Sequence, residues 1–201
     1  TVLGGTSGWT VGNASFSADY DVTIMNPTYK GDGTPLSIVT KSKNIEIENP
    51  NFSTFGRDGI LISSGASDVK VKGGVIEILG TADNSRRAIM VRPQFVYSDT
   101  IGAKTGKVIF DGTKLRGVGN IHLRDDFSFT FINPDIELNN PTINIFSQQA
   151  YSVGGLPIDF VVKGGEIRGN YNQAFSITNL PNRKYEITGI TLSEKSFSLY
   201  V

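Results

Sequence analysis

The stretch VVKGGEIRGN, Val161–Asn170, contains the pattern that decides the fold. Apolar and polar residues alternate up to two glycines, and a second alternating run follows them. The same arrangement occurs in VKVKGGVIEI at residues 69–78 and, less regularly, in TFINPDIELNN at residues 130–140. A period of two is typical of a β-strand with one buried face. The stretch is therefore interpreted as one unit of an internal repeat, with its two-residue turn as the reference point.

Seven copies of this unit align on the turn. The turns are Asn26-Pro27, Asn49-Pro50, Gly73-Gly74, Gly112-Thr113, Asn133-Pro134, Gly164-Gly165 and Gly189-Ile190. In every copy an apolar pair precedes the turn, an apolar residue follows three positions after its first residue, and a second apolar pair comes later. The fifth copy has Ile143 and Ile145 as this second pair, and the seventh has Phe197 and Leu199. Turn-to-turn spacings of 23, 24, 39, 21, 31 and 25 residues are typical of a solenoid with occasional insertions.

The repeat predicts an all-β, single-stranded, right-handed parallel β-helix of about seven coils with three short strands each. Residues 20–201 form this domain, and residues 1–19 form an N-terminal cap or a degenerate coil. An antiparallel sandwich also has short strands between turns, but it does not require the same slots to be apolar in every copy. Because the closing stretch SFSLYV starts a further strand, we expect the domain to be a segment of a longer chain.

The composition excludes several classes of function. Lysine plus arginine and aspartate plus glutamate both number 19, which argues against nucleic-acid binding. Cysteine is absent and His122 is the only histidine, so we expect no metal site and no cofactor. No apolar run approaches the length of a membrane span and no signal peptide is evident, so membrane insertion is not expected.

Two long connections point to a candidate site, because solenoid loops often carry function. RPQFVYSDTIGAKTGK (residues 92–107) and FSQQAYSVGGLPID (residues 146–159) flank the coil that contains IHLRDDFSF (residues 121–129). We expect the two connections to form walls and the middle coil a floor, with His122 facing outward beside Met90 and Asn144. The candidate glycan-binding residues are Arg92, Gln94, Tyr97, His122, Arg124, Gln148, Gln149 and Tyr151.

Carboxylates, amides and aromatic rings in one groove suit a sugar chain, since polar groups hold hydroxyls and ring faces stack on apolar sugar faces. Paired carboxylates also hydrolyse glycosidic bonds. If the protein is an enzyme, the candidate catalytic residues are Asp125, Asp126 and Asp99. The alternative interpretation is a solvated turn at residues 124–126 and a surface histidine at position 122.

Two further features favour contacts with other surfaces. Ile109, Thr130 and Val161 are expected in one outward row on consecutive coils, and exposed rows of this kind usually mark an interface. The insertion EILGTADNSRRA at residues 77–88 contributes Arg86 and Arg87, for which packing or a subunit contact is expected.

The coils NIEIENPNF (residues 44–52), DVKVKGGVIEI (residues 68–78) and FVVKGGEIRGN (residues 160–170) resemble those of right-handed β-helix proteins of the pectate-lyase-like superfamily. Within it, the chain is most similar to bacteriophage tailspikes and related virion appendages. The resemblance covers about residues 20–201 and is architectural, with no catalytic motif to transfer by position. It implies a homotrimer displayed on a virion tail, outside the cell, beside other tail proteins and binding the surface polysaccharide of a host.

Three hypotheses follow. The first is a tailspike-like module that recognises a cell-surface polysaccharide as part of a homotrimer. The second is a glycoside hydrolase or polysaccharide lyase that acts on that glycan. The third is a structural spacer or adhesin stalk without a ligand.

Overall fold

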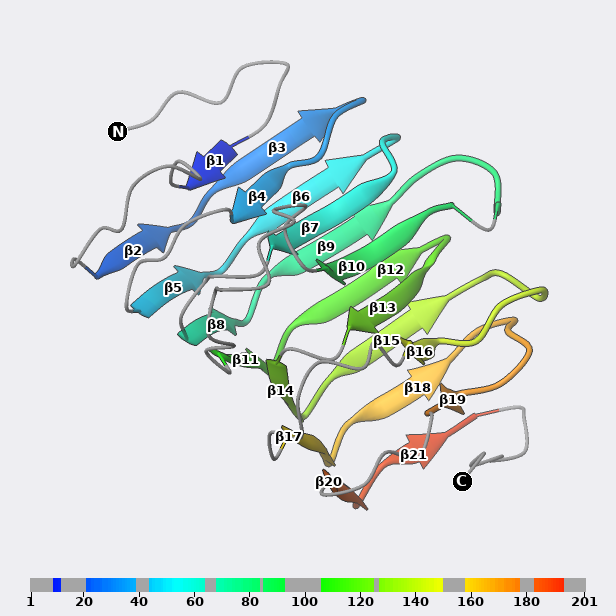
Figure 1. Cartoon of the computed structure of the whole chain (residues 1–201). Helices are drawn as coiled ribbons and strands as arrows, with labels where there is room; N and C mark the ends of the chain where they lie inside the picture. Colours follow the sequence, from blue (N-terminus) through cyan, green and yellow to red (C-terminus); the bar gives the residue numbers. More distant parts are fainter. Residues whose placement is uncertain are drawn as a thin grey trace, which may run out of the picture.

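The computed structural model describes residues 9–11, 21–38, 44–63, 68–83, 85–92, 106–124, 127–149, 158–177 and 183–193. These residues form strands and turns only, and the strands assemble into three parallel sheets of seven strands each (Figure 1). Each sheet takes every third strand along the chain, so every coil contributes one strand to each sheet. The prediction of a parallel β-helix with three strands per coil is confirmed, and the antiparallel sandwich is excluded.

We call the three sheets A, B and C. Sheet A contains β1 (Trp9–Val11), β4 (Leu36–Ile38), β7 (Asp58–Ser63), β10 (Arg87–Arg92), β13 (Asn120–Arg124), β16 (Phe146–Gln149) and β19 (Phe175–Ser176). Sheet B contains β2 (Val22–Met25), β5 (Asn44–Glu48), β8 (Asp68–Lys72), β11 (Gly106–Asp111), β14 (Phe127–Ile132), β17 (Ile158–Lys163) and β20 (Arg183–Thr188). Sheet C contains β3 (Thr28–Gly31), β6 (Asn51–Thr54), β9 (Val75–Ile78), β12 (Lys114–Gly117), β15 (Asp135–Leu138), β18 (Glu166–Arg168) and β21 (Thr191–Leu192).

The two-residue turn of the repeat connects sheet B to sheet C in every coil. Its first residue has a positive φ in all seven copies, from 45° at Asn133 to 65° at Gly164 and Gly189. Glycine adopts this left-handed conformation without a steric penalty, and asparagine tolerates it better than other residues with a side chain. The turn positions chosen from the sequence are therefore the corners of the solenoid.

The interior is filled by the apolar residues of the repeat and changes character along the axis. The coils near the N-terminus stack isoleucine and valine, such as Ile45 on Val69. The later coils stack rings: Phe110 lies on Phe131 with centroids 5.2 Å apart, and Phe146 lies on Phe175 with centroids 5.0 Å apart. Burial of these side chains against neighbouring coils supplies the core that no coil has alone.

The fifth coil departs from the sequence prediction. Its strand in sheet A begins at Phe146, which pairs with Ile121 and Phe175. The expected pair Ile143 and Ile145 therefore precedes the strand, and only Ile145 of the two is buried in the core. Ile145 is buried at the corner before the strand. The ring of Phe146 takes the inward position instead, because it stacks on Phe175 and meets Phe131 edge to face at 5.0 Å. The second pair of the seventh coil, Phe197 and Leu199, lies outside the described residues.

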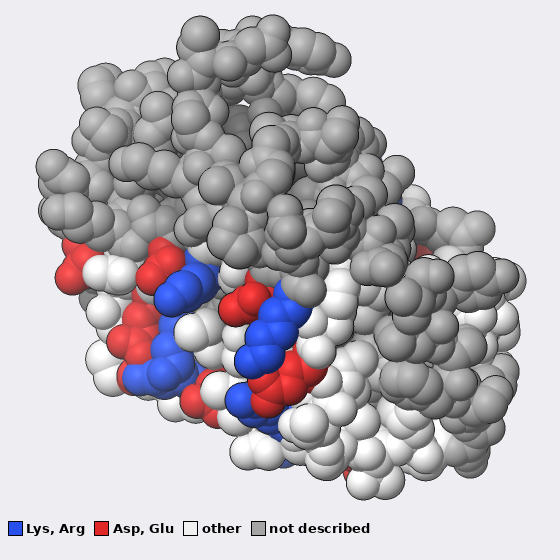
Figure 2. Space-filling view, turned by 60° about the horizontal axis from the view of Figure 1, so that its bottom comes forward, with Lys and Arg blue, Asp and Glu red and all other residues white. Residues whose placement is uncertain are grey.

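The expected outward row of sheet B is present in register but is less exposed than predicted. Ile109 pairs with Thr130, and Thr130 pairs with Val161. Ile109 and Thr130 are half-buried, and only 9% of Val161 is exposed within the single chain. On this side of the molecule basic and acidic side chains are interspersed (Figure 2).

At the N-terminal end, β1 adds to sheet A by pairing with β4.

Candidate functional site

The candidate site occupies the carboxyl-terminal ends of β10, β13 and β16, three consecutive strands of sheet A. His122 in β13 pairs with Met90 in β10 and with Ser147 in β16. The prediction that Asn144 lies beside His122 is wrong, because β16 begins three residues later than expected. Arg92, Arg124 and Gln149 each lie two residues after the member of this row on their own strand. All three therefore lie at the carboxyl-terminal ends of their strands, on the same side of the sheet.

Three residues expected in the wall loops belong instead to the strands. Arg92 ends β10, and Gln148 and Gln149 end β16. Gln148 pairs with Leu123, and Gln149 pairs with Arg124. The structure therefore brings five of the sequence-predicted residues together on three adjacent strands: Arg92, His122, Arg124, Gln148 and Gln149.

The other candidates lie outside the described residues: Gln94, Tyr97, Asp99, Asp125, Asp126 and Tyr151. The strand bounds still define the connections that contain them. Residues 93–105 join β10 to β11 and residues 150–157 join β16 to β17, whereas residues 125–126 suffice between β13 and β14. After β2, the two longest connections from sheet A to sheet B thus leave from the strands on either side of β13. Residues 12–21, between β1 and β2, form a third long connection.

The outer face of sheet A beside these residues is partly apolar. Met90 is 2% exposed although its register places it on the outer face, and it is not part of the interior cluster. His122 beside it is half-buried. Ser147 continues the row and pairs with Ser176 on β19. The sequence analysis placed Met90 beside His122 correctly, but it did not predict that Met90 is buried.

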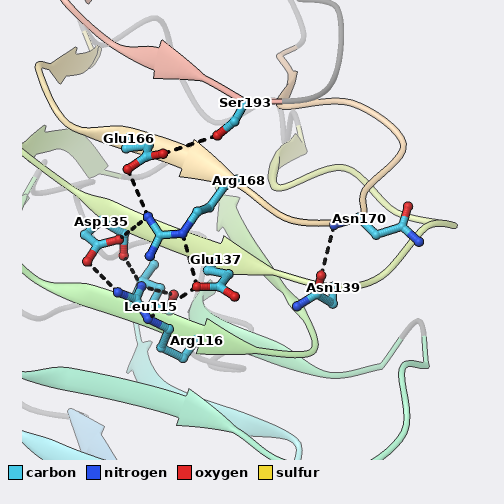
Figure 3. Close-up of polar contacts among 9 residues, drawn as sticks. All are labelled: Leu115, Arg116, Asp135, Glu137, Asn139, Glu166, Arg168, Asn170 and Ser193. Atoms are coloured by element: carbon cyan, nitrogen blue, oxygen red, sulfur yellow. Dashed lines mark hydrogen bonds and ion pairs between the residues drawn. The ribbon is translucent and has the colours of Figure 1, made fainter.

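The densest polar cluster of the described residues lies elsewhere, on the outer face of sheet C (Figure 3). Arg116 on β12 forms an ion pair and a hydrogen bond with Asp135 on β15. Arg168 on β18 lies 2.9 Å from Asp135, 3.1 Å from Glu137 and 3.0 Å from Glu166. The pairs cross from one coil to the next, so they link three consecutive coils.

Protonation of this cluster follows from its contacts. Partial burial alone raises the pKa of Asp135, but the hydrogen bond and charge of Arg116 and the nearby Arg168 outweigh it and hold the pKa below its usual range. The Asp135 carboxylate therefore remains charged and paired at neutral pH. Since each acid already has a basic partner, the cluster stabilises the stacking of coils and leaves no unpaired carboxylate for acid–base chemistry.

The insertion between β9 and β10 is attached to the rest of the solenoid, in agreement with the expected packing role. Arg86 donates hydrogen bonds to the carbonyl oxygens of Phe55 at 2.6 Å and Leu79 at 2.9 Å. Asn140, from a later coil, donates to the carbonyl oxygen of Asp83 at 3.1 Å. Arg87 lies 3.7 Å from the buried carboxylate of Asp58.

Among the residues with a described placement, no group of three or more histidine, aspartate or glutamate side chains is arranged to hold a metal ion. The described part of the chain also has no helix that is long and apolar enough to cross a membrane. Comparison with protein families, with curated proteins and with solved structures finds no match.

Proposed function

We propose that the protein is a glycan-recognition module that binds a cell-surface polysaccharide along β10, β13 and β16. The supporting observation is the grouping of Arg92, His122, Arg124 and Gln149 on adjacent strands between the two long connections. Neighbouring strands lie about 4.8 Å apart, so one polar position recurs on each rung along the solenoid axis. A regularly spaced row of this kind suits an extended polymer of repeating units better than a compact small molecule.

The chemistry of the row fits sugar hydroxyls. Amide and imidazole groups both donate and accept hydrogen bonds, whereas guanidinium groups donate several in a fixed geometry. The proposal extends to a tailspike-like homotrimer at the virion tail, which rests on the resemblance and on the row Ile109, Thr130 and Val161.

The test is a screen of the purified protein against immobilised bacterial surface polysaccharides, followed by titration of each hit. His122→Ala and Gln149→Ala should each weaken binding at least about fivefold, which corresponds to the loss of one hydrogen bond of about 1 kcal/mol. Gln173→Ala is the matched control, because Gln173 is a half-buried glutamine on the corner that precedes β19. Binding that is absent from every polysaccharide, or equal in all three variants, would contradict the proposal.

The same incubations distinguish binding from cleavage and monomer from trimer. New reducing ends would indicate a hydrolase or lyase, whereas their absence with retained binding limits the protein to recognition. Light scattering at micromolar concentration measures the assembly directly, and a monomer would contradict the homotrimer.

A further inference from the structure

The outer face of sheet B has an uncharged strand with charged strands on both sides of it. β14 presents Ser128, Thr130 and Ile132 outward, between the buried residues Phe129 and Phe131. Its neighbours are β11 on one side and β17 on the other. Each of these two strands presents one apolar residue between two charged ones, so β14 is the centre of a symmetric pattern.

The order of the charges is reversed across β14. On β11 the outward residues are, in chain order, a base, an apolar residue and an acid: Lys107, Ile109 and Asp111. On β17 they are an acid, an apolar residue and a base: Asp159, Val161 and Lys163. The register places Lys107 and Asp159 at one position along the strand direction, and Asp111 and Lys163 at another.

The same reversal recurs one coil further from the centre. On β8, Asp68 and Lys70 occupy the two positions that Lys184 and Glu186 occupy on β20. Each of these two positions thus has opposite charges on the two strands. The third position has Lys72 on β8 and an uncharged threonine on β20.

Contacts within the chain do not explain the match across β14. β11 and β17 are two strands apart, about 9.6 Å, which is too far for an ion pair between Lys107 and Asp159 of one chain. Lys107 and Asp111 form no ion pair with another residue in the described part of the chain. Lys163 does have a partner, Glu186 at 2.9 Å on the next strand. The reversed order is therefore better explained by a second surface.

We infer that the outer face of sheet B binds a second copy of the chain, with the two solenoids antiparallel and a two-fold axis parallel to β14. Rotation by 180° about this axis exchanges the strands on the two sides of β14 and keeps each position along the strand direction. Lys107 then faces the partner's Asp159, and Asp111 faces the partner's Lys163. One coil further out, Asp68 and Lys70 face the partner's Lys184 and Glu186. Every charged residue that faces a charged residue thus meets the opposite sign.

The uncharged residues of this face are also compatible with the pairing. Ile109 faces the partner's Val161, while Thr130 and Ile132 face their own counterparts. A two-fold contact of this kind uses the same patch on both copies, which is the commonest arrangement of homodimers.

A parallel pairing of the same faces fits less well. A two-fold axis along the solenoid would place each strand opposite its own copy. Lys70 would then face the partner's Lys70, and Glu186 would face the partner's Glu186. Like charges opposite each other disfavour an interface, so the antiparallel orientation is preferred.

The size of the overlap sets the expected strength. Five strands, from β8 to β20, overlap in the antiparallel pair. At about 4.8 Å between strands and about 17 Å along each strand, the flat area is about 400 Å² per copy. Standard interfaces bury about 800 Å² per partner, so we expect a weak dimer that dissociates in the micromolar range.

The experiment is sedimentation velocity of the purified chain from about 1 µM to about 500 µM. We expect a monomer that becomes a dimer as concentration rises, with weaker association at higher salt. Lys107→Glu should weaken dimerisation about tenfold, because it places like charges opposite each other at two symmetric contacts. Lys107→Glu with Asp159→Lys should return the affinity to within about threefold of the wild type, because the exchanged residues again face opposite charges.

The matched control is Lys107→Glu with Asp111→Lys. It has the same two substitution types and the same net charge as the first double variant, but it places like charges opposite each other at four contacts. No dimer should form in this variant over the same range, while circular dichroism should show the same melting curve for both double variants.

The outcomes separate the possible assemblies. A dimer in the control variant but not in the Lys107→Glu, Asp159→Lys variant would overturn the antiparallel orientation and indicate the parallel one. A trimer would overturn the inference and support the homotrimer, for which this dimer is the alternative; a monomer throughout would overturn both. The inference goes beyond glycan recognition, which is measured separately with the sheet A variants, so either proposal can fail alone.

Discussion

Replacement of single turn glycines should have very unequal effects, depending on what lies on the adjacent coil. A methyl group added at Gly165 would lie 2.2 Å from the carbonyl oxygen of Pro134 and 2.6 Å from its nitrogen. At Gly112 the same methyl group would meet no atom within 4 Å. Both glycines have left-handed backbones, with φ of 82° and 64°. Gly112→Ala therefore measures the conformational penalty alone, and Gly165→Ala adds a collision with the backbone below.

The expected free energies follow from these contacts. A left-handed alanine costs about 1–2 kcal/mol, partly offset by about 0.4–1 kcal/mol because alanine restricts the unfolded chain. Gly112→Ala should thus lower the free energy of unfolding by about 1 kcal/mol. Forcing extra atoms into a packed site typically costs about 1–3 kcal/mol more, so Gly165→Ala should cost about 2–4 kcal/mol. Gly112→Asn should cost less than Gly112→Ala, since asparagine occupies the equivalent position at Asn49 with φ of 49°.

Thermal and urea unfolding monitored by circular dichroism provide the measurement. For a chain of this size each kcal/mol shifts the melting temperature by about 2–4 °C, so Gly165→Ala should melt roughly 5 °C below Gly112→Ala. Melting temperatures within about 1 °C of each other, or a lower value for Gly112→Ala, would show that close contact between turns does not limit the stacking of coils.

Three other substitutions test the remaining layers of the structure. Phe131→Ala removes a fully buried ring that contacts three other rings, so it should lower the free energy of unfolding in urea by about 3–5 kcal/mol. Ile132→Ala on the outer face should lower it by less than about 1.5 kcal/mol. Equal costs would contradict the assignment of Phe131 to the interior and Ile132 to the outer face. Arg86→Gln leaves carbonyl oxygens without their charged donor, so amides of residues 79–87 should exchange hydrogen faster while those of β14 are unchanged. Asp135→Asn should destabilise the protein at pH 7, because the arginines bind only the charged form of Asp135. The difference in stability between wild type and variant should shrink as the pH falls below the usual carboxyl pKa of 3.8 and through the lowered pKa of Asp135. A difference that is constant from pH 7 to pH 2.5 would contradict the ion pairs.

Much of the architecture could be predicted from the sequence because the same slots of the repeat are apolar in every copy. An inward slot such as that of Ile76 recurs as Leu115, Ile136 and Ile167, and the structure buries all four side chains. The turns were equally accessible, since only glycine and asparagine combine frequently with positive φ. Local alternation and turn chemistry thus contained enough information to assign the strands to three sheets.

The register of the fifth coil could not be predicted from the sequence, because Ile145 and Phe146 are adjacent apolar residues that are both buried. Alternation alone does not choose between them. The choice depends on Phe175, one coil later, whose ring stacks on Phe146 nearly parallel at 6°. That contact also places Gln148 and Gln149 in a strand, so the candidate site depended on a packing choice outside the local sequence.

The charge network of sheet C could be predicted from the sequence only in part. No single coil indicates it, since its ion pairs join residues from different coils. With the coils aligned on their turns, however, Arg116 falls between Glu77 and Glu137, and the alternation of charge is apparent. The pairing was therefore present in the aligned repeat, whereas the distances and the arginine bridge to Asp135 required the structure.

The repetition of equivalent coils gives this fold an adjustable length. Residues 49–72 comprise one turn and one strand from each sheet, β6, β7 and β8. They include neither residues 93–105 nor residues 150–157, the long connections beside the candidate site. Removing them would join Glu48 to Gly73 and stack the third coil directly on the first, with β10 beside β4. Since each coil contacts only its neighbours, β10, β13 and β16 would keep their mutual arrangement. Gain or loss of whole coils is thus a route by which such a chain changes its length during evolution while its candidate site is preserved.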